Sequence, residues 1–267
     1  MSRPWSALGK RVAITGAGSG IGRALAQTLS RAGARSLLCL DNNIESCRKT
    51  VESLGSANAI AAQCDASNRT SLQAALRAAD IDLFCANAGV ATVGDCSAPE
   101  AAWDFTWRLN TMQTVYAAEV LVPSMIERGG GAFLVTASAA GLLTQLGSAP
   151  YAVTKAAAVG LSEWLAITHG DDGIRVCCVC PQGVRTPMIM GENEGDAATV
   201  AAAAGVDGLL EPEEVADEAL RCLEEGIFLC MPGGDKGPER HVVRKAADRE
   251  RWIGGMRRLQ SKLKKAS

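Results

Sequence analysis

The sequence predicts an α/β fold, a doubly wound Rossmann sheet of seven parallel strands with helices on both faces. Two observations predict it. Short, continuously apolar runs alternate with segments of helical periodicity along most of the 267 residues. The first apolar run also leads directly into a glycine-rich turn. Because both faces of a parallel sheet are covered, its strands are apolar throughout rather than at alternate positions.

Turn-forming residues such as Gly16, Asp41 and Pro181 follow the apolar runs and mark the strand ends. We expect strands at residues 11–15, 36–40, 57–64, 81–86, 131–136, 174–180 and 227–231. Between and after them, helical patterns predict helices at residues 20–32, 43–54, 68–79, 103–128, 150–169 and 212–225. This alternation is typical of βαβ units.

Composition indicates one large folded unit. Hydrophobic residues make up 48% of the chain, and no Pro/Gly/Ser-rich linker or low-complexity block divides it. We predict a single Rossmann-type domain over residues 1–238. A basic amphipathic helix over residues 239–267 is expected to belong to that domain or to an oligomer contact.

The sequence shows no targeting signal. Its N-terminus lacks the apolar core of a signal peptide, and no run approaches the roughly 18 apolar residues of a membrane span. We therefore expect a cytoplasmic protein with no integral span. Its ten cysteines are then expected to be reduced thiols. Because the chain has two histidines and no pair of CxxC motifs, no metal site is expected.

Charge is unevenly distributed. Residues 240–267 contain ten Lys/Arg and two Asp/Glu, so they carry +8 and the rest of the chain carries −10. No nucleic-acid partner is expected. Apolar residues in this tail have helical spacing, which is compatible with packing on the protein or on a second subunit, and also with an anionic membrane surface. They are Trp252, Ile253, Met256, Leu259 and Leu263.

A glycine-rich turn, Gly16-Ala-Gly-Ser-Gly-Ile-Gly22, follows the first expected strand and opens a helix. Glycine lets the backbone approach a pyrophosphate, and the helix N-terminus offers free N–H groups and the positive end of its dipole. The spacing GxxxGxG differs from the widespread GxGxxG, but the strand before and the helix after supply the required context. The expected cofactor-binding residues of the turn are Gly16, Gly18, Ser19, Gly20, Ile21 and Gly22.

Asp41 ends the second expected strand, nineteen residues after Gly22. A carboxylate there can accept hydrogen bonds from the ribose hydroxyls of a dinucleotide and repels a 2′-phosphate. The alternative is that Asp41 caps the helix that begins near Asn43. No Lys or Arg lies inside the glycine turn or directly after Asp41, which favours NAD(H) over NADP(H).

Tyr151 and Lys155 lie four residues apart at the start of an expected helix and so share one face of it. A free tyrosine has a pKa of about 10, and a nearby ammonium favours the phenolate. The pair can therefore exchange a proton with an alcohol or a carbonyl. Ser138 follows the fifth expected strand, so it meets Tyr151 at the carboxyl edge of the sheet, where such sheets bind ligands.

Over about residues 8–232 the chain resembles the classical short-chain dehydrogenase/reductase family. Residues 15–22 match its TGxxxGIG turn, residues 87–89 its NAG segment and residues 181–186 the segment that touches nicotinamide. The resemblance implies a catalytic set of Asn110, Ser138, Tyr151 and Lys155. It adds as cofactor-binding residues Cys64, Asp65, Asn87, Ala88, Gly89, Pro181, Val184 and Thr186, besides Tyr151 and Lys155.

The resemblance also implies roles. Tyr151 is the general acid/base, Lys155 lowers its pKa and binds the nicotinamide ribose, and Ser138 hydrogen-bonds the substrate oxygen. Asn110 holds a water of the proton relay, the alternative being a polar residue satisfied locally within its helix. Asp65 contacts adenine, and Val184 and Thr186 hold the nicotinamide carboxamide. The chain departs from the family pattern at Gln182, where a glycine is usual, and at Ala86, where the family commonly has Asn.

These features predict an NAD(H)-dependent oxidoreductase that interconverts a secondary alcohol and a ketone by hydride transfer. Two alternatives stay open: a non-catalytic NAD-binding regulatory module and an NADP(H)-dependent carbonyl reductase. The apolar residues Met188, Ile189 and Met190, in the expected substrate loop at residues 187–208, favour an apolar small-molecule substrate. The resemblance implies a homodimer or homotetramer.

Overall fold

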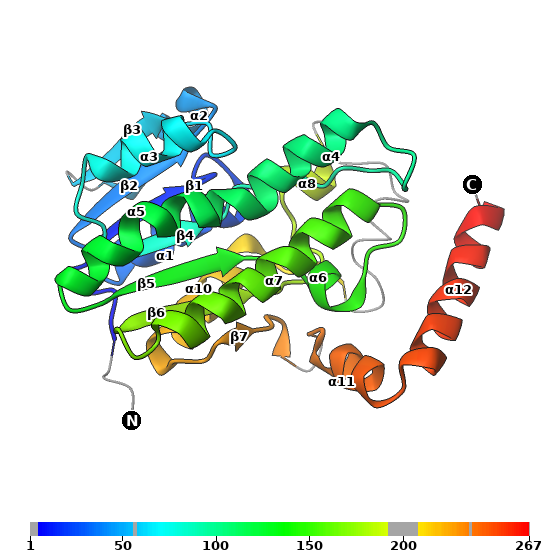
Figure 1. Cartoon of the computed structure of the whole chain (residues 1–267). Helices are drawn as coiled ribbons and strands as arrows, with labels where there is room; N and C mark the ends of the chain where they lie inside the picture. Colours follow the sequence, from blue (N-terminus) through cyan, green and yellow to red (C-terminus); the bar gives the residue numbers. More distant parts are fainter. Residues whose placement is uncertain (1–4, 56–57, 192–207, 235–236, 267) are drawn as a thin grey trace.

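A seven-stranded parallel sheet forms the centre of the molecule (Figure 1). The computed structural model describes residues 5–55, 58–191, 208–234 and 237–266. The strands lie in the order β3-β2-β1-β4-β5-β6-β7, which confirms the predicted fold class. They are β1 (Arg11–Thr15), β2 (Ser36–Asp41), β3 (Ala59–Gln63), β4 (Leu83–Ala86), β5 (Gly131–Thr136), β6 (Ile174–Val179) and β7 (Leu229–Cys230).

Helices cover both faces of the sheet (Figure 1). One face carries α1 (Gly20–Arg31), α2 (Ile44–Leu54) and α10 (Pro212–Glu225), and the other carries α3 (Arg69–Arg77), α5 (Gln113–Glu127) and α7 (Ala149–His169). Successive residues of one strand therefore enter different cores: Val12 and Ile14 pack under α1, whereas Ala13 packs under α5. This double coverage is the reason for the continuous apolar runs.

The predicted helix at residues 103–128 is interrupted. The structure has α4 (Glu100–Trp107), a π-helical turn η1 (Arg108–Met112) and then α5. A π turn adds a residue to the helical repeat, a departure that apolar periodicity does not reveal. Two short helices, α6 (Ala139–Leu143) and α8 (Pro187–Met190), were not predicted because four or five residues are too few for a periodic pattern.

The C-terminal segment is two helices rather than the one predicted. They are α11 (Glu239–Ala247) and α12 (Arg249–Ala266). Asp248 between them is extended, at φ −151°, and its carboxylate accepts a hydrogen bond from the backbone N–H of Arg251 at 2.9 Å. Asp248 thus ends one helix and caps the next. Residues 192–207 of the predicted substrate loop lie outside the described residues.

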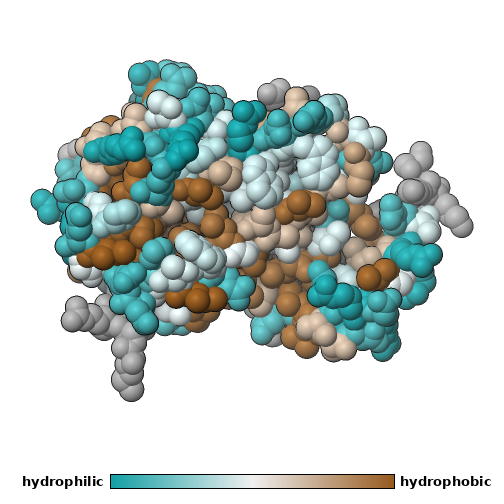
Figure 2. Space-filling view, in the orientation of Figure 1, coloured by the Kyte–Doolittle hydropathy of each residue, from teal (hydrophilic) through white to brown (hydrophobic). Residues whose placement is uncertain are grey.

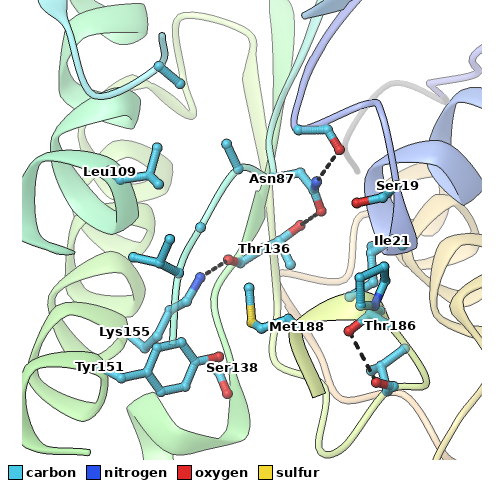
Figure 3. A pocket seen from close by; sticks show the side chains of 18 of the residues that line it. Ser19, Ile21, Asn87, Leu109, Thr136, Ser138, Tyr151, Lys155, Thr186 and Met188 are labelled. Atoms are coloured by element: carbon cyan, nitrogen blue, oxygen red, sulfur yellow. Dashed lines mark hydrogen bonds between the residues drawn. The ribbon is translucent and has the colours of Figure 1, made fainter. Parts of the chain in front are cut away.

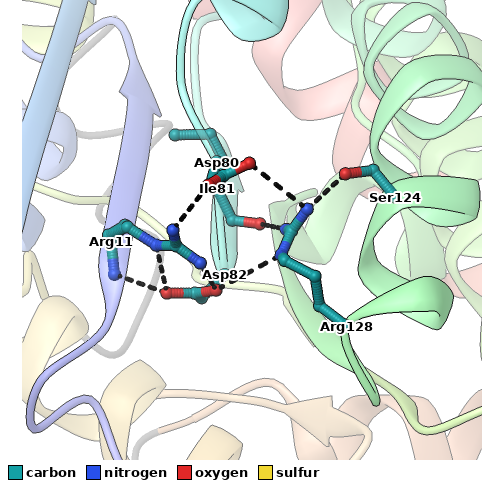
Figure 4. A network of polar contacts seen from close by, with 6 residues as sticks. All are labelled: Arg11, Asp80, Ile81, Asp82, Ser124 and Arg128. Carbon is teal, nitrogen blue, oxygen red and sulfur yellow. Dashed lines mark hydrogen bonds and ion pairs between the residues drawn. The ribbon is translucent and has the colours of Figure 1, made fainter.

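A network of charges joins the amino ends of β1 and β4 to α5 (Figure 4). The Arg11 guanidinium donates to both oxygens of Asp82, at 2.9 and 2.8 Å, and to Asp80 at 2.9 Å. Arg128 lies on the other side and donates to the carbonyl of Ile81. Burial opposes ionisation of Asp82, but its hydrogen bonds with Arg11 outweigh burial and hold the pKa of Asp82 below its usual range.

Replacing Asp82 with Asn should lower the free energy of unfolding by about 2 kcal/mol near neutral pH, because Arg11 loses a charged partner. A carboxylate whose pKa is lowered by folding stabilises the folded state fully at pH values above its unfolded pKa of about 3.9. This stabilisation is lost as the pH falls through the pKa of the folded state. In urea denaturation, the difference in stability between wild type and Asp82→Asn should therefore shrink as the pH falls below the unfolded value of about 3.9.

The control for this change is Glu45→Gln, which breaks the exposed ion pair with Arg48. It should alter stability by about 0.5 kcal/mol or less. Equal stability of Asp82→Asn and Glu45→Gln would show that the network does not stabilise the sheet.

Candidate active site

A cavity of about 510 Å³ opens at the carboxyl ends of the strands, around the point where β1 and β4 lie side by side and the strand order reverses. Most of the predicted site residues line it. They are Gly16, Ser19, Gly20, Ile21, Asp41, Cys64, Asp65, Asn87, Ala88, Gly89, Ser138, Tyr151, Lys155, Pro181, Val184 and Thr186. Three predicted residues are not in the lining: Gly18, Gly22 and Asn110.

The glycines of the turn from β1 into α1 have little room for a side chain. A Cβ atom on Gly22 would lie 2.0 Å from the carbonyl oxygen of Gly16, and Gly16 itself has φ +66°. A Cβ on Gly20 would lie 2.9 Å from the Thr186 side chain. At these glycines the turn therefore presents backbone, together with the N-terminus of α1 and the side chains of Ser19 and Ile21, to the cavity, which fits a pyrophosphate.

Asp41 holds the turn from the end of β2. Its carboxylate accepts the backbone N–H of Gly18 at 2.8 Å and that of Asn43 at 2.9 Å. The alternative that Asp41 caps α2 is wrong, because the N-cap is Asn43, whose side chain accepts the Ser46 N–H at 3.1 Å. Asp41 still lines the cavity, so it is placed to meet an adenosine ribose.

Arg23 follows Gly22 directly and places a cation near the turn, which the sequence prediction of cofactor preference did not include. The Arg23 guanidinium donates to the carbonyl of Gly18 and to Thr50 Oγ1, and Arg23 is absent from the lining of the cavity. Within the described residues, Lys155 is the one Lys or Arg in that lining. The adenosine end therefore offers a carboxylate and no facing cation.

The segment after β3 forms the far end of the cavity. Asp65 is exposed, and its carboxylate accepts the Ser67 N–H at 2.9 Å and the Ser67 hydroxyl at 2.6 Å. Cys64 is buried beneath it. Both positions line the cavity beyond Asp41, where an adenine ring attached to that ribose can be accommodated.

A buried hydrogen-bond hub joins β1 to the segment after β4. Thr15 Oγ1 accepts the backbone N–H groups of Asn87 at 3.0 Å and Ala88 at 3.1 Å. It donates to Gln113 Oε1 at 2.8 Å, and the Gln113 amide donates to the carbonyls of Ala88 and Leu109. Gln113 was not predicted, because a single Gln in a helix has no sequence signal.

Asn110 lies in the π turn and is buried. Its Oδ1 accepts the Val90 N–H at 2.9 Å, and its Nδ2 donates to the Val90 carbonyl at 3.0 Å and to Thr154 Oγ1 at 3.1 Å. None of these three partners lies in the helix of Asn110, so the alternative of a side chain satisfied locally within its own helix is wrong. The side chain thereby fixes the segment after Gly89 against α7.

Ser138, Tyr151 and Lys155 gather at the ends of β5 and α7 (Figure 3). Lys155 is buried, and its Nζ donates to the Thr136 carbonyl at 2.8 Å and lies 5.7 Å from the centroid of the Tyr151 ring. Ser138 Oγ accepts the Ala140 N–H at 3.1 Å and lies beside the Tyr151 hydroxyl (Figure 3). Thr136 lines the cavity and was also missed by the sequence analysis.

Burial dominates the ionisation of this group. It raises the pKa of Tyr151 above its ordinary value, although the hydrogen bond from Ser138 opposes the shift. It lowers the pKa of Lys155 to about 8. The predicted lowering of the tyrosine pKa by Lys155 is thus not seen in the protein alone, because desolvation of the phenolate is the larger effect.

The segment after β6 closes the cavity on the side of α1. Thr186 Oγ1 donates to the Val184 carbonyl at 3.3 Å, and Val184 pairs with Leu210 in an isolated bridge. Gln182 lines the cavity at the position where the sequence departs from the family pattern. The remaining wall is apolar and consists of Val90, Phe105, Leu109, Met188 and Ile189.

Comparisons with known proteins agree with this geometry. The family described as short chain dehydrogenase matches residues 10–197. Meso-2,3-butanediol dehydrogenase of Serratia marcescens is 33% identical over 216 residues, which cover 78% of this chain and 84% of that protein.

Two solved structures show the same fold. A short chain dehydrogenase/reductase from Burkholderia phymatum, in complex with NAD, aligns with a TM-score of 0.80 and 26% identity over 92% of this chain and 96% of its own. L-sorbose reductase from Gluconobacter frateurii, complexed with NADPH and L-sorbose, aligns with a TM-score of 0.75 and 27% identity over 83% and 95%.

The chain belongs to the short-chain dehydrogenase/reductase family. It is an oxidoreductase that acts on CH–OH groups and their ketones with a nicotinamide dinucleotide. In the described part of the chain, no group of three or more His, Cys, Asp or Glu side chains is arranged to hold a metal ion. None of the described helices is both long enough and apolar enough to cross a membrane.

Replacing Gly22 with Ala should weaken NADH binding by about tenfold or more, because the new methyl group collides with the Gly16 carbonyl and opens the turn. Fluorescence titration with NADH measures the affinity. The control is Gly160→Ala in α7, where a Cβ meets open space and helix propensity improves by up to about 1 kcal/mol. Unchanged affinity in Gly22→Ala would mean that the turn does not bind the cofactor.

Proposed function

We propose that the protein is an NAD(H)-dependent oxidoreductase that interconverts a secondary alcohol and a ketone, with Tyr151 as the general acid/base. The observation that carries the proposal is the convergence of Ser138, Tyr151 and Lys155 on a cavity with an apolar wall. A substrate oxygen placed between the hydroxyls of Ser138 and Tyr151 would meet one group that orients it and one that exchanges its proton.

When bound, the nicotinamide accepts the hydride from the alcohol or supplies it to the ketone. The residues of this chain handle the proton. In oxidation, Tyr151 Oη takes the hydroxyl proton; in reduction, it returns a proton to the forming alkoxide. Burial keeps Tyr151 protonated near neutral pH, which is the state required for reduction. The Lys155 ammonium favours the phenolate that oxidation requires.

Asn110 is best explained as a positioning residue. Its amide binds both backbone groups of Val90 and the hydroxyl of Thr154, one residue before Lys155. A Cβ on Gly89 would lie 3.1 Å from Asn110 Oδ1 and 3.4 Å from Lys155 Nζ, so these groups pack closely around Gly89. The proposed role of Asn110 is to keep Lys155 and the segment after β4 in register, beside any water of a proton relay.

The NAD(H) preference rests on Asp41. Its carboxylate is fixed at the proposed adenosine end of the cavity. A ribose 2′-phosphate there would meet a negative charge, and the one Lys or Arg of the described lining, Lys155, belongs to the catalytic group instead. The principal alternative is NADP(H)-dependent carbonyl reduction, for which Arg23 would have to turn from Gly18 toward the cavity.

The substrate proposed is a small molecule with an apolar body, since Leu109, Phe105 and Met188 face the catalytic group without a charged side chain among them. A homo-oligomer is proposed as well. Helix α7 faces the viewer in Figure 1 and exposes Trp164 and Ile167, by 55% and 77%, and Figure 2 shows hydrophobic side chains on this face. The cytoplasmic location stays a prediction from the sequence.

Asp41→Ser tests the cofactor proposal. Wild type should bind NADH about tenfold or more tightly than NADPH, and the substitution should remove most of that difference because the repelling charge is gone. Both affinities are measured by nicotinamide fluorescence. Asn42→Ser, at the neighbouring lining position, is the control and should keep the wild-type preference. Tighter NADPH binding by wild type would overturn the assignment.

Tyr151→Phe tests the catalytic proposal. The variant should lose about 10²- to 10⁴-fold in the rate of alcohol oxidation, since it has no group to take the proton. NADH affinity should stay within about twofold of wild type, because the ring and Lys155 remain. Initial rates are measured with NAD⁺ and a panel of secondary alcohols. Retained activity would exclude Tyr151 as the acid/base, and a wild type that binds NADH without oxidoreductase activity would favour a regulatory NAD-binding module.

A further inference from the structure

Helix α12 stands away from the body of the molecule (Figure 1). Its contacts run through α11, which packs on α6, where Lys245 Nζ donates to the Leu142 carbonyl. A helix of this length without tertiary packing is marginal in water. Gly254 and Gly255 weaken it further, by up to about 1 kcal/mol each. A surface that covered α12 would therefore stabilise it as a helix.

One side of α12 is apolar. Trp252, Met256 and Leu259 follow each other at four- and three-residue spacing and form a stripe, with Ile253 beside it. Leu259 and Ile253 are each 45% exposed. The opposite side carries Ser261 and basic residues. The stripe has the pattern of a helix that packs on a protein surface.

The charge of α12 points to what covers the stripe. Residues 249–266 contain seven Lys/Arg and one Glu, a net charge of +6. The rest of the chain then has 20 Lys/Arg and 28 Asp/Glu, a net charge of −8. A second copy of this chain therefore offers α12 an attracting surface of opposite charge.

We propose that α12 is an exchange arm, which packs its Trp252–Met256–Leu259 stripe on the body of a second copy of this chain. Twofold symmetry makes the exchange reciprocal, so two arms and two bodies contribute to one interface. Because α11 binds α6, and α6 is capped by Ser138, each arm also ties the second copy to the wall of the active site.

An anionic bilayer fits α12 less well. A membrane that attracts the +6 arm would repel the −8 body held next to it. Gly254 and Gly255 contribute no apolar surface to a bilayer, whereas small residues allow close approach of another chain.

The test is a pair of matched substitutions in the full-length protein. Leu259→Glu places a charge in the stripe, and Ser261→Glu places the same charge on the opposite side. Analytical ultracentrifugation over a concentration series should show that Leu259→Glu raises the dissociation constant of self-association by about tenfold or more, or converts the assembly to one with fewer subunits. Ser261→Glu should behave as wild type. Raising NaCl to about 0.5 M should weaken the wild-type assembly through screening.

A second measurement locates the arm directly. Carbodiimide joins lysines to carboxylates in contact, so the covalent dimer band of wild type should contain links between α12 and the body that the monomer band lacks. Circular dichroism checks that the body of Leu259→Glu still unfolds cooperatively. Its melting temperature should fall at concentrations where wild type is assembled, because the lost contact no longer stabilises the folded state.

Three outcomes would overturn the proposal: self-association unchanged by Leu259→Glu, arm-to-body links of equal yield in both bands, or a monomeric wild type. Sedimentation of wild type with vesicles rich in phosphatidylserine, abolished by Leu259→Glu, would assign the stripe to a lipid surface instead. These readouts need no turnover, so they stand apart from the tests of the oxidoreductase function.

Discussion

The site depends on one buried joint, the hydroxyl of Thr15 at the end of β1. It accepts the N–H groups of Asn87 and Ala88 and donates to Gln113, which in turn binds the carbonyls of Ala88 and Leu109. The glycine turn follows Thr15 directly, and Tyr151 and Lys155 lie beyond the segment after β4. A few shared hydrogen bonds thus hold the two halves of the cavity at a set distance. Their burial makes them specific, because an unmatched polar group there is costly.

Around this hydrogen-bonded group, ionisable side chains lie at both ends of the strands but in different surroundings. Arg11, Asp82 and Arg128 occupy the amino ends of the strands, where partial exposure allows ion pairs. At the carboxyl ends, Lys155 and Tyr151 are buried beside an apolar wall, and burial pushes both toward their neutral forms. The amino edge of the sheet therefore carries ion pairs that stabilise the fold. The carboxyl edge carries Lys155 and Tyr151, whose pKa values are shifted by burial. Helix α12 lies outside both edges, and its proposed contact is with a second copy of the chain.

Local patterns in the sequence were sufficient for most of the fold. Continuous apolar runs mark strands because both faces of a parallel sheet are covered, and glycines mark the turn because a Cβ at Gly22 has no space. The motif residues also lie at predictable positions, Asp41 and Ser138 at strand ends and Tyr151 near the start of α7, so they could be placed at one edge of the sheet in advance. The π turn at Asn110 and the break at Asp248 escaped prediction, since single-residue changes of helical register leave little trace in periodicity.

By itself, then, the sequence placed the cavity at the carboxyl edge of the sheet, with the glycine turn and the group of Ser138, Tyr151 and Lys155 in its lining, because each is encoded by neighbouring residues. Tertiary structure alone decided the rest. It showed that Gln113 and Thr136 support the site, that the Asn110 amide binds Val90 and Thr154, and that burial raises the pKa of Tyr151. These facts depend on contacts between residues far apart in the chain, and on how much water each group loses, which no local spacing records.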